Sequence, residues 1–273
     1  MHKMDHLFLS DIDGTLLRRD VPLRAEVIAA AKEYTDKGGL LSVCTGRSLP
    51  AAQGVAQALG VNAPSILYGG AAIYDFQKKS YLYAQPFQWD VMQAVRAVLA
   101  QNADISVQVL TLDNIYVLHR NHRLDQWGVR EENIGPLCSA EDVSGPVLKL
   151  VMCCDDPAKL EFCRQFFLPE FCNYTFASRT FVDVVAAGYG KGEALQTLSQ
   201  LTGIPYGRFF CAGDAMTDLP MLRLAGISFA PENAMDAVKI AVTRVVPDIH
   251  QGGMAEAFRY AAHTITTSGC SSV

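Results

Sequence analysis

Short apolar runs alternate with amphipathic stretches in the first third of the chain. The runs at 6–10, 40–44 and 65–68 have the length and composition of buried strands. Between them, residues 23–37 and 49–59 carry apolar side chains at helical spacing, and each stretch ends at glycine. This βαβαβ order predicts a parallel, doubly wound sheet with right-handed crossovers.

The middle of the chain has a different pattern. Strand-like runs there are interrupted by two predicted helices, at 89–101 and 157–167; the runs lie at 80–85, 105–112, 114–120, 147–154, 173–177 and 181–185. This mixture predicts an α+β module with a largely antiparallel sheet. The first pattern then returns, with predicted helices at 191–201 and 216–225 and predicted strands at 208–212 and 226–230.

We therefore expect an α/β fold with two domains. A doubly wound, Rossmann-like parallel core would comprise residues 1–82 and 188–273, and an inserted α+β domain would comprise residues 83–187. Hinges would lie near 82–87 and 186–190. The small, polar tail at 264–273 is expected to fray.

Two carboxylates follow the first predicted strand, in the segment Asp11-Ile12-Asp13-Gly14. Sites of open α/β sheets lie at the carboxyl ends of the strands, so both side chains belong to such an edge. One carboxylate can attack a phosphorus or carbon centre and form an ester, while the second transfers protons. Together they can bind a hard divalent cation. Asp-Gly also occurs in ordinary turns, so the pair needs support from the rest of the chain.

Three further polar positions follow predicted strands or begin predicted helices. Thr45-Gly46 offers a hydroxyl and backbone N–H groups to phosphoryl oxygens, although this segment also suits an ordinary turn. Lys191 begins a helix, where the helix dipole disfavours a cation unless an anion lies beside it; the alternative is a solvated lysine. Asp214 and Asp218 flank a strand–helix junction, where they would repel each other unless a cation is bound; the alternative is helix capping.

The composition narrows the range of partners. The 273 residues are 50% hydrophobic and carry a formal net charge of −5, without a long run of like charge. This argues against nucleic acid or an anionic membrane as the main partner. No apolar run reaches the roughly 20 residues that span a bilayer, and no signal peptide is visible, so we expect a cytoplasmic protein. The eight cysteines include no C-x-x-C pair, and we expect them to be reduced and structural.

In combination these motifs resemble the haloacid dehalogenase-like (HAD) hydrolase superfamily, and more narrowly the Cof-type phosphatases with a C2B cap. The resemblance covers nearly the whole chain and rests on D-I-D-G-T-L, T-G-R, G-K-G-E-A-L, G-D-A-M-T-D-L-P-M-L and the later P-E-N-A-M. It implies that the inserted domain is a cap over the active site. An Asp at position 13 implies a phosphatase or phosphomutase, because carbon–halogen hydrolases do not need this acid and the phosphotransferring pumps carry Thr there.

The resemblance also implies a role for each motif residue. Asp11 would be the nucleophile that forms an aspartyl-phosphate, and Asp13 the general acid and then the base. Thr45 and Lys191 would hold phosphoryl oxygens. The family's Mg²⁺ would be bound by the Asp11 carboxylate, the Asp13 backbone carbonyl and Asp214. The groups expected behind these ligands are Asp218, which would orient Lys191 or a metal-bound water, and Thr217. The expected substrate contacts are Gly46, Arg47 and Asn233.

Three positions depart from the family's pattern, since Thr217, Gly69 and Asp248 stand where Asn is usual. These changes leave the nucleophile, acid, lysine and metal ligand intact but bear on substrate choice. The candidate substrate contacts from the cap are Tyr116, Arg120, His122, Arg123 and Arg179. The alternative for each is a place on the solvated surface or in the core. A metal site at His119, His122 and Asp125 would need a helix, whereas the pattern there predicts a strand end and a loop.

The leading hypothesis is a Mg²⁺-dependent phosphatase that acts on small phosphorylated metabolites, such as sugar phosphates or phosphorylated cofactors. It would work as a monomer or homodimer. The alternatives are a phosphomutase of the same fold and a non-catalytic sensor of phosphorylated metabolites. The substitution Asp11→Asn would distinguish an enzyme from a sensor, because it would abolish turnover while ligand binding could survive.

Overall fold

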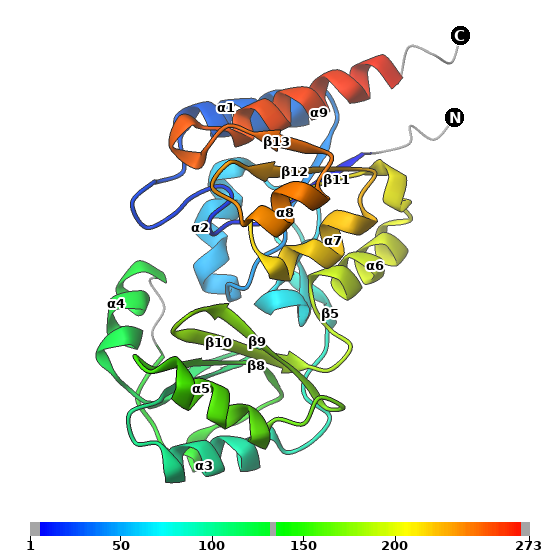
Figure 1. Cartoon of the computed structure of the whole chain (residues 1–273). Helices are drawn as coiled ribbons and strands as arrows, with labels where there is room; N and C mark the ends of the chain where they lie inside the picture. Colours follow the sequence, from blue (N-terminus) through cyan, green and yellow to red (C-terminus); the bar gives the residue numbers. More distant parts are fainter. Residues whose placement is uncertain (1–5, 132–134, 269–273) are drawn as a thin grey trace.

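The computed structural model describes residues 6–131 and 135–268, which form two lobes connected by two chain segments (Figure 1). The first lobe contains both the first and the last third of the chain. The second lobe is formed by the middle of the chain, which confirms the α/β fold with an inserted, largely antiparallel module.

The first lobe is built on a five-stranded parallel sheet in the order β13-β12-β11-β1-β2. Its strands are β1 (Leu7–Ser10), β2 (Leu40–Val43), β11 (Phe209–Ala212), β12 (Ile227–Pro231) and β13 (Arg244–Val246). Strand side chains alternate between the two faces, so Phe8 packs on one side and Leu7 and Leu9 on the other. The sheet is therefore buried on both faces, as a parallel sheet requires.

Helices cover both faces of this sheet. On the Phe8 side lie α1 (Ala25–Asp36), α2 (Leu49–Leu59) and α9 (Met254–Ser268), with α1 and α9 side by side (Figure 1). On the other side lie α6 (Lys191–Thr202), α7 (Leu219–Leu224) and α8 (Asp236–Ala241). The predicted helix at 216–225 begins with a 3₁₀ turn, Met216–Asp218, before α7.

A small antiparallel sheet lies at the end of β2. Its strands are β3 (Ser65–Leu67), β4 (Ala72–Asp75) and β5 (Ser80–Ala84). We expected residues 65–68 as a third parallel strand. Instead a single parallel bridge, between Cys44 and Ile66, connects β3 to the end of β2. The continuous hydrogen-bonded pairing of β3 is with β4 and is antiparallel. Gly69 and Gly70 adopt positive φ, which reverses the chain so that β4, not predicted from the sequence, pairs with β3.

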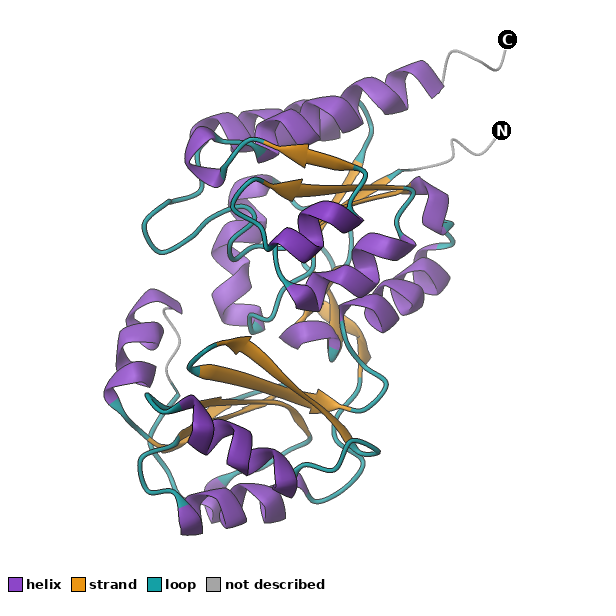
Figure 2. Ribbon diagram, in the orientation of Figure 1, coloured by secondary structure: helices purple, strands orange, loops and turns teal. Residues whose placement is uncertain are grey.

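The second lobe has a five-stranded antiparallel sheet in the order β7-β6-β8-β10-β9. The strands are β6 (Ser106–Thr111), β7 (Ile115–His119), β8 (Val147–Cys153), β9 (Cys172–Ser178) and β10 (Phe181–Ala186). Helices α3 (Val91–Gln101) and α5 (Pro157–Cys163) cover the face turned away from the first lobe (Figure 2). The other face is turned toward the first lobe.

Further segments differ from the sequence prediction, which assigned no element to α8, β13 or α9. Residues 122–131 form helix α4 (His122–Glu131) where a strand end and a loop were expected. There Asp125 is paired with Arg120, and His122 Nε2 lies 3.2 Å from Asp155, so these side chains do not converge on a metal. Residues 264–268 continue α9, so the expected fraying is wrong for them, and 269–273 lie outside the described residues.

Seven cysteines lie in the described ranges, and all are free thiols, in agreement with the reduced state expected from the sequence. The remaining one, Cys270, lies outside those ranges. Across 6–131 and 135–268, helices of the length and hydropathy that a bilayer crossing requires are absent.

Candidate active site

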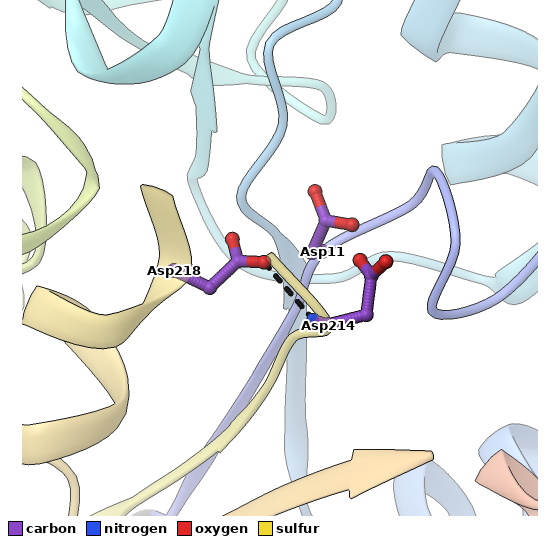
Figure 3. Close-up of side chains that lie close together, drawn as sticks. All are labelled: Asp11, Asp214 and Asp218. Carbon is purple, nitrogen blue, oxygen red and sulfur yellow. Dashed lines mark hydrogen bonds between the residues drawn. The ribbon is translucent and has the colours of Figure 1, made fainter. Parts of the chain in front are cut away.

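The motif residues meet at the carboxyl ends of β1 and β11. These strands are neighbours in register, and the backbone N–H of Asp11 donates to the carbonyl of Ala212 at 2.9 Å. Asp11 therefore directly follows β1, and Asp214 follows β11 after Gly213, at the same edge of the sheet. Figure 3 shows Asp11, Asp214 and Asp218 around one small space at this edge. It is the edge where the sequence predicted the site.

Lys191 lies between two of these carboxylates. Its Nζ donates to Asp11 Oδ1 at 2.6 Å and to Asp218 Oδ1 at 2.5 Å. All three residues are buried, with exposed fractions of 4% for Asp11, 7% for Lys191 and 0% for Asp218. The alternative of a solvated lysine at the start of α6 is therefore excluded by its position.

The second oxygen of Asp218 is also occupied. Asp218 Oδ2 accepts a hydrogen bond from the backbone N–H of Asp214 at 3.0 Å (Figure 3). It also accepts one from the N–H of Ala215 at 2.9 Å. Asp218 thus fixes both the lysine and the turn that carries Asp214. Asp218 caps this turn, which was the purely structural interpretation of the sequence. It also contacts Lys191, which is what the family resemblance implied.

Burial and mutual repulsion control the charges here. Burial raises the pKa of Asp11 well above its usual range, and the neighbouring Asp218, Asp214 and Asp13 add to this, while Lys191 opposes it. Burial also raises the pKa of Asp214 to about 6, with a further contribution from Asp218. Burial disfavours the charge on Lys191, but Asp11 and Asp218 outweigh it and raise the pKa of this lysine, which stays protonated.

The acidic cluster fits a divalent metal. Asp11, Asp214 and Asp218 each offer an oxygen, and these atoms lie within 4.8 Å of one another. Carboxylate oxygens are the ligands that hard divalent cations prefer, and such a cation would relieve their repulsion. Because Asp218 already accepts three hydrogen bonds, Asp11 and Asp214 are the better ligands.

The turn after β1 leaves room for Asp214 only because it contains glycine. Gly14 has a φ of +89°, and a Cβ there would lie 2.2 Å from Asp214 Oδ2. Thr15, next in the chain, donates its hydroxyl to Asp214 Oδ1 at 3.1 Å. Thr15 was not predicted as a site residue, although its hydroxyl in the turn that begins with Asp13-Gly14 was a usable signal.

Asp13 is bound to the neighbouring T-G-R segment. Arg47 Nε and Nη2 donate to the two carboxylate oxygens of Asp13 at 2.8 and 2.7 Å, a bidentate pair. The Asp13 side chain is 50% exposed, whereas that of Arg47 is 11% exposed. Arg47 also donates to the carbonyl of Ala51 at 3.1 Å, which anchors it to α2.

Thr45 and Asn233 lie behind this surface. Thr45 is fully buried, and its hydroxyl accepts from the backbone N–H of Arg47 at 3.2 Å. Asn233 donates to the carbonyl of Gly14 at 2.8 Å and accepts from the N–H of Ile249 at 3.0 Å. The structure thus places Asn233 against the Gly14 turn rather than in the lining of the cavity.

The three departures from the usual Asn have separate surroundings. Thr217 lines the cavity beside Asp218. Gly69 has a φ of +71° and donates its N–H to the carbonyl of Thr45 at 2.9 Å, so a flexible residue suits that turn. Asp248 accepts from the N–H of His250 at 2.8 Å and caps a 3₁₀ turn, away from the acidic cluster.

A cavity of about 1270 Å³ lies between the two lobes. The predicted residues that line it are Asp11, Asp13, Gly46, Arg47, Lys191, Asp214, Thr217 and Asp218. The lining from the second lobe includes Lys149, Val151, Asp183 and Val185 and omits Tyr116, Arg120, His122, Arg123 and Arg179, the candidates taken from the sequence. The sequence analysis missed Lys149 and Asp183, whose signal was a charge inside each of two strongly apolar strands.

Solved structures with the same fold cover nearly the whole chain. A haloacid dehalogenase-like hydrolase from Bacteroides thetaiotaomicron superposes with a TM-score of 0.85 at 20% identity, over 93% of this chain and 98% of that one. A sugar phosphatase of HAD subclass IIB superposes with a TM-score of 0.82 at 22% identity, over 95% of this chain and 99% of that one.

Characterised relatives are similar over comparable lengths. The 5-amino-6-(5-phospho-D-ribitylamino)uracil phosphatase YitU of Bacillus subtilis is 24% identical, over 93% of this chain and 97% of its own. The pyridoxal phosphate phosphatase YbhA of Escherichia coli is 26% identical, over 87% of this chain and 92% of its own. The family model for haloacid dehalogenase-like hydrolases matches residues 8–258. The resemblance seen in the motifs is confirmed, and the chain belongs to the haloacid dehalogenase-like hydrolase family.

Proposed function

We propose that this chain is a Mg²⁺-dependent phosphatase that hydrolyses small phosphorylated metabolites through an aspartyl-phosphate on Asp11. The chain is a phosphatase of the HAD family, as its motifs predicted, and its relatives act on phosphorylated cofactors and metabolic intermediates. The observation that carries the proposal is the buried pair of Asp11 and Lys191 beside Asp214, at the edge of a cavity.

In the first step Asp11 attacks the phosphorus. Lys191 holds Oδ1 of Asp11, which leaves Oδ2 to form the new P–O bond while the ester P–O bond breaks. The ammonium group also offsets the charge of the nucleophile, so that an anionic phosphate can approach it. Asp13 gives a proton to the departing oxygen.

Arg47 has to change partner during this step. Both carboxylate oxygens of Asp13 accept from Arg47, so the guanidinium occupies the acid while this pair lasts. A bound phosphoryl group supplies the guanidinium with equivalent oxygens. We infer that Arg47 moves from Asp13 to the substrate and so frees the acid, with Gly46 and the buried Thr45 forming the adjacent phosphate-binding segment.

In the second step the roles of Asp13 reverse. It takes a proton from a water molecule, whose oxygen attacks the phosphorus of the aspartyl-phosphate and releases Asp11. Asp218 keeps Lys191 and the Asp214 turn in place throughout. Mg²⁺, held by Asp11, Asp214 and the Asp13 carbonyl, would offset charge on the phosphoryl oxygens.

The proposed division assigns residues 1–82 and 188–273 to the catalytic core and 83–187 to the cap. The change from the parallel sheet to the five-stranded antiparallel sheet supports it. The cap would exclude bulk water from the site and select the leaving group, since both lobes line the cavity.

The test is phosphate release from hexose phosphates, pyridoxal phosphate and flavin mononucleotide. Each is assayed with Mg²⁺, with chelator and with the Asp11→Asn variant. We expect Mg²⁺-dependent release that the variant lowers about 10⁴-fold or more, as for loss of other nucleophiles. Release that persists in the variant would disprove the role of Asp11, and transfer to a second metabolite without phosphate release would indicate a mutase.

A further inference from the structure

Lys149 and Asp183 form an ion pair on the face of the cap sheet that is turned toward the catalytic core. Lys149 lies on β8 and Asp183 on the adjacent β10, where Lys149 pairs in register with Val185 and Asp183 with Val151. The two side chains are diagonal neighbours on one face, and Lys149 Nζ donates to Asp183 Oδ2 at 2.7 Å. Both residues line the cavity that contains Asp11.

The pair also contacts the core beside the proposed phosphate-binding segment. Lys149 Nζ donates to the backbone carbonyl of Gly46 at 2.9 Å. A Cβ at position 46 would lie 3.3 Å from Lys149 Nζ and 3.5 Å from Asp183 Oδ2. The two charged groups therefore lie beside Gly46, in the segment proposed to bind the phosphate.

Stability alone does not account for these charges. The Lys149 side chain is 4% exposed and that of Asp183 28%, and the desolvation of a buried lysine costs about as much energy as its pairing returns. Apolar residues of similar volume would hold the sheet equally well, and Val151 and Val185 surround the pair on the same face. A charged pair in this place therefore indicates a binding role.

We propose that Lys149 and Asp183 determine specificity by binding a hydroxyl of the leaving group, so that the enzyme favours phosphate esters of polyols and sugars. The proposal rests on the proposed phosphatase function. A lysine ammonium has three N–H donors, two of which meet Gly46 and Asp183, and a carboxylate has several acceptor positions. A hydroxyl accepts from the ammonium and donates to the carboxylate at once, which an unsubstituted alkyl group cannot do. Val151 and Val185 would contact the carbon skeleton.

The test compares glucose 6-phosphate with cyclohexylmethyl phosphate, which has a similar ring and ester carbon but no hydroxyl. The variants are Lys149→Met and the double substitution Lys149→Met with Asp183→Leu, which removes both charges. Lys159→Met is the matched control, because Lys159 forms an exposed pair with Asp104 on the same lobe, outside the cavity lining. Thermal unfolding of each variant verifies that it folds.

We expect the wild type to prefer glucose 6-phosphate. The ratio of kcat/KM for the two esters should fall about 10- to 100-fold in both Lys149 variants, the usual size of one or two charge-assisted hydrogen bonds. The ratio in Lys159→Met should equal that of the wild type. An equal fall for both esters would show that the pair only holds the lobes together, and an unchanged ratio, or no preference in the wild type, would also overturn the proposal.

Binding provides a second readout. In the Asp11→Asn background, calorimetry measures the affinity for the same two esters without turnover. Loss of the affinity ratio on Lys149→Met would support the hydroxyl-binding role, and its persistence would contradict it. Absence of phosphate release by the wild type would refute the phosphatase function for these esters, while the binding ratio would still decide the role of the pair.

Discussion

At the scale of single residues, the site depends on Lys191. It is the cation in contact with both Asp11 and Asp218, and all three side chains are buried. A buried charge that loses its partner is expensive, whereas an exposed pair contributes little. This difference gives a direct test of how the acidic cluster is stabilised.

Lys191→Met should lower the free energy of unfolding of the metal-free protein by about 3 kcal/mol or more, because it removes the cation that contacts the two buried carboxylates of Asp11 and Asp218. Lys32→Met is the control: it removes an exposed i,i+4 pair with Asp36 on α1 and should change stability by less than about 1 kcal/mol. Urea unfolding measures both. A loss no larger for Lys191→Met than for Lys32→Met would contradict the assigned charge balance.

Gly14 gives a second test at this scale. Gly14→Ala adds a Cβ that would lie 2.2 Å from Asp214 Oδ2, so it should displace this carboxylate and weaken Mg²⁺ binding. Gly203→Ala is the matched control, because Gly203 also has a positive φ (+73°) but nothing within 4 Å of its Cβ. Both variants should lose about 1 kcal/mol to backbone strain. Calorimetric titration with Mg²⁺ should show a weaker affinity in Gly14→Ala alone.

Single residues also show which parts of the site the sequence reveals. Asp11, Lys191 and Asp214 were predictable because each stands at a strand end or helix start, where its charge has no structural reason to be. Lys149 and Asp183 were not found, since a charge inside an apolar strand identifies neither its face nor its partner. That information comes from the pairing of β8 with β10, two strands about 30 residues apart.

At the scale of elements, the crossing of α6 and α7 sets the position of Lys191. Gly192 lies against Pro220, and a Cβ on Gly192 would lie 2.6 Å from Pro220 Cβ. The glycine allows the start of α6 to approach the turn that carries Asp218. A larger residue would separate the two helices and lengthen the contact between Lys191 and Asp218.

Substitution of two helical glycines by alanine should therefore have opposite effects. Gly192→Ala should lower both stability and kcat, because it pushes α6 away from α7. Gly54→Ala, in the exposed middle of α2 with nothing within 4 Å, should raise stability by about 0.5–1 kcal/mol through helix propensity. Chemical unfolding and steady-state kinetics measure both effects, and a stabilising Gly192→Ala would disprove the proposed constraint.

Most elements were predictable from hydrophobic periodicity, and the exceptions have physical causes. The helix predicted at 49–59 matches α2, because its apolar face and terminal glycine are clear. Strand β4 was missed because four residues after a glycine pair carry too little pattern. Helix α4 was missed because its sequence, His122–Glu131, is mostly polar and contains glycine, so few apolar residues mark it as a helix.

At the scale of the whole molecule, the acidic cluster links stability to pH and to metal. In the folded protein the pKa of Asp214 is about 6, above its ordinary value of 3.8, so the folded state binds a proton more tightly than the unfolded chain. This group therefore contributes stability below pH 4 that is lost as the pH rises through 6. A divalent cation bound at neutral pH would take the place of this proton.

The metal-free protein should therefore gain stability as the pH falls from 7.5 to 5, and Asp214→Asn should gain less. Addition of Mg²⁺ should raise the Tm at pH 7.5, because the ion binds the folded state and stabilises it. The rise should be smaller at pH 5, where protons compete for the site. Thermal unfolding with and without chelator measures all four values. An equal effect of Mg²⁺ at both pH values would show that Asp214 is not a ligand that competes with protons.

The pairing of β1 with β11 has a consequence for how the protein is made. Leu7 on β1 is in register with Phe209 on β11, so β1 pairs with this neighbour only after the entire inserted domain has left the ribosome. The cap has its own sheet and apolar core, and it can fold while the first strands are still incomplete. Asp11 and Asp214 therefore meet only late in synthesis, and a nascent chain that ends before β11 lacks the proposed site.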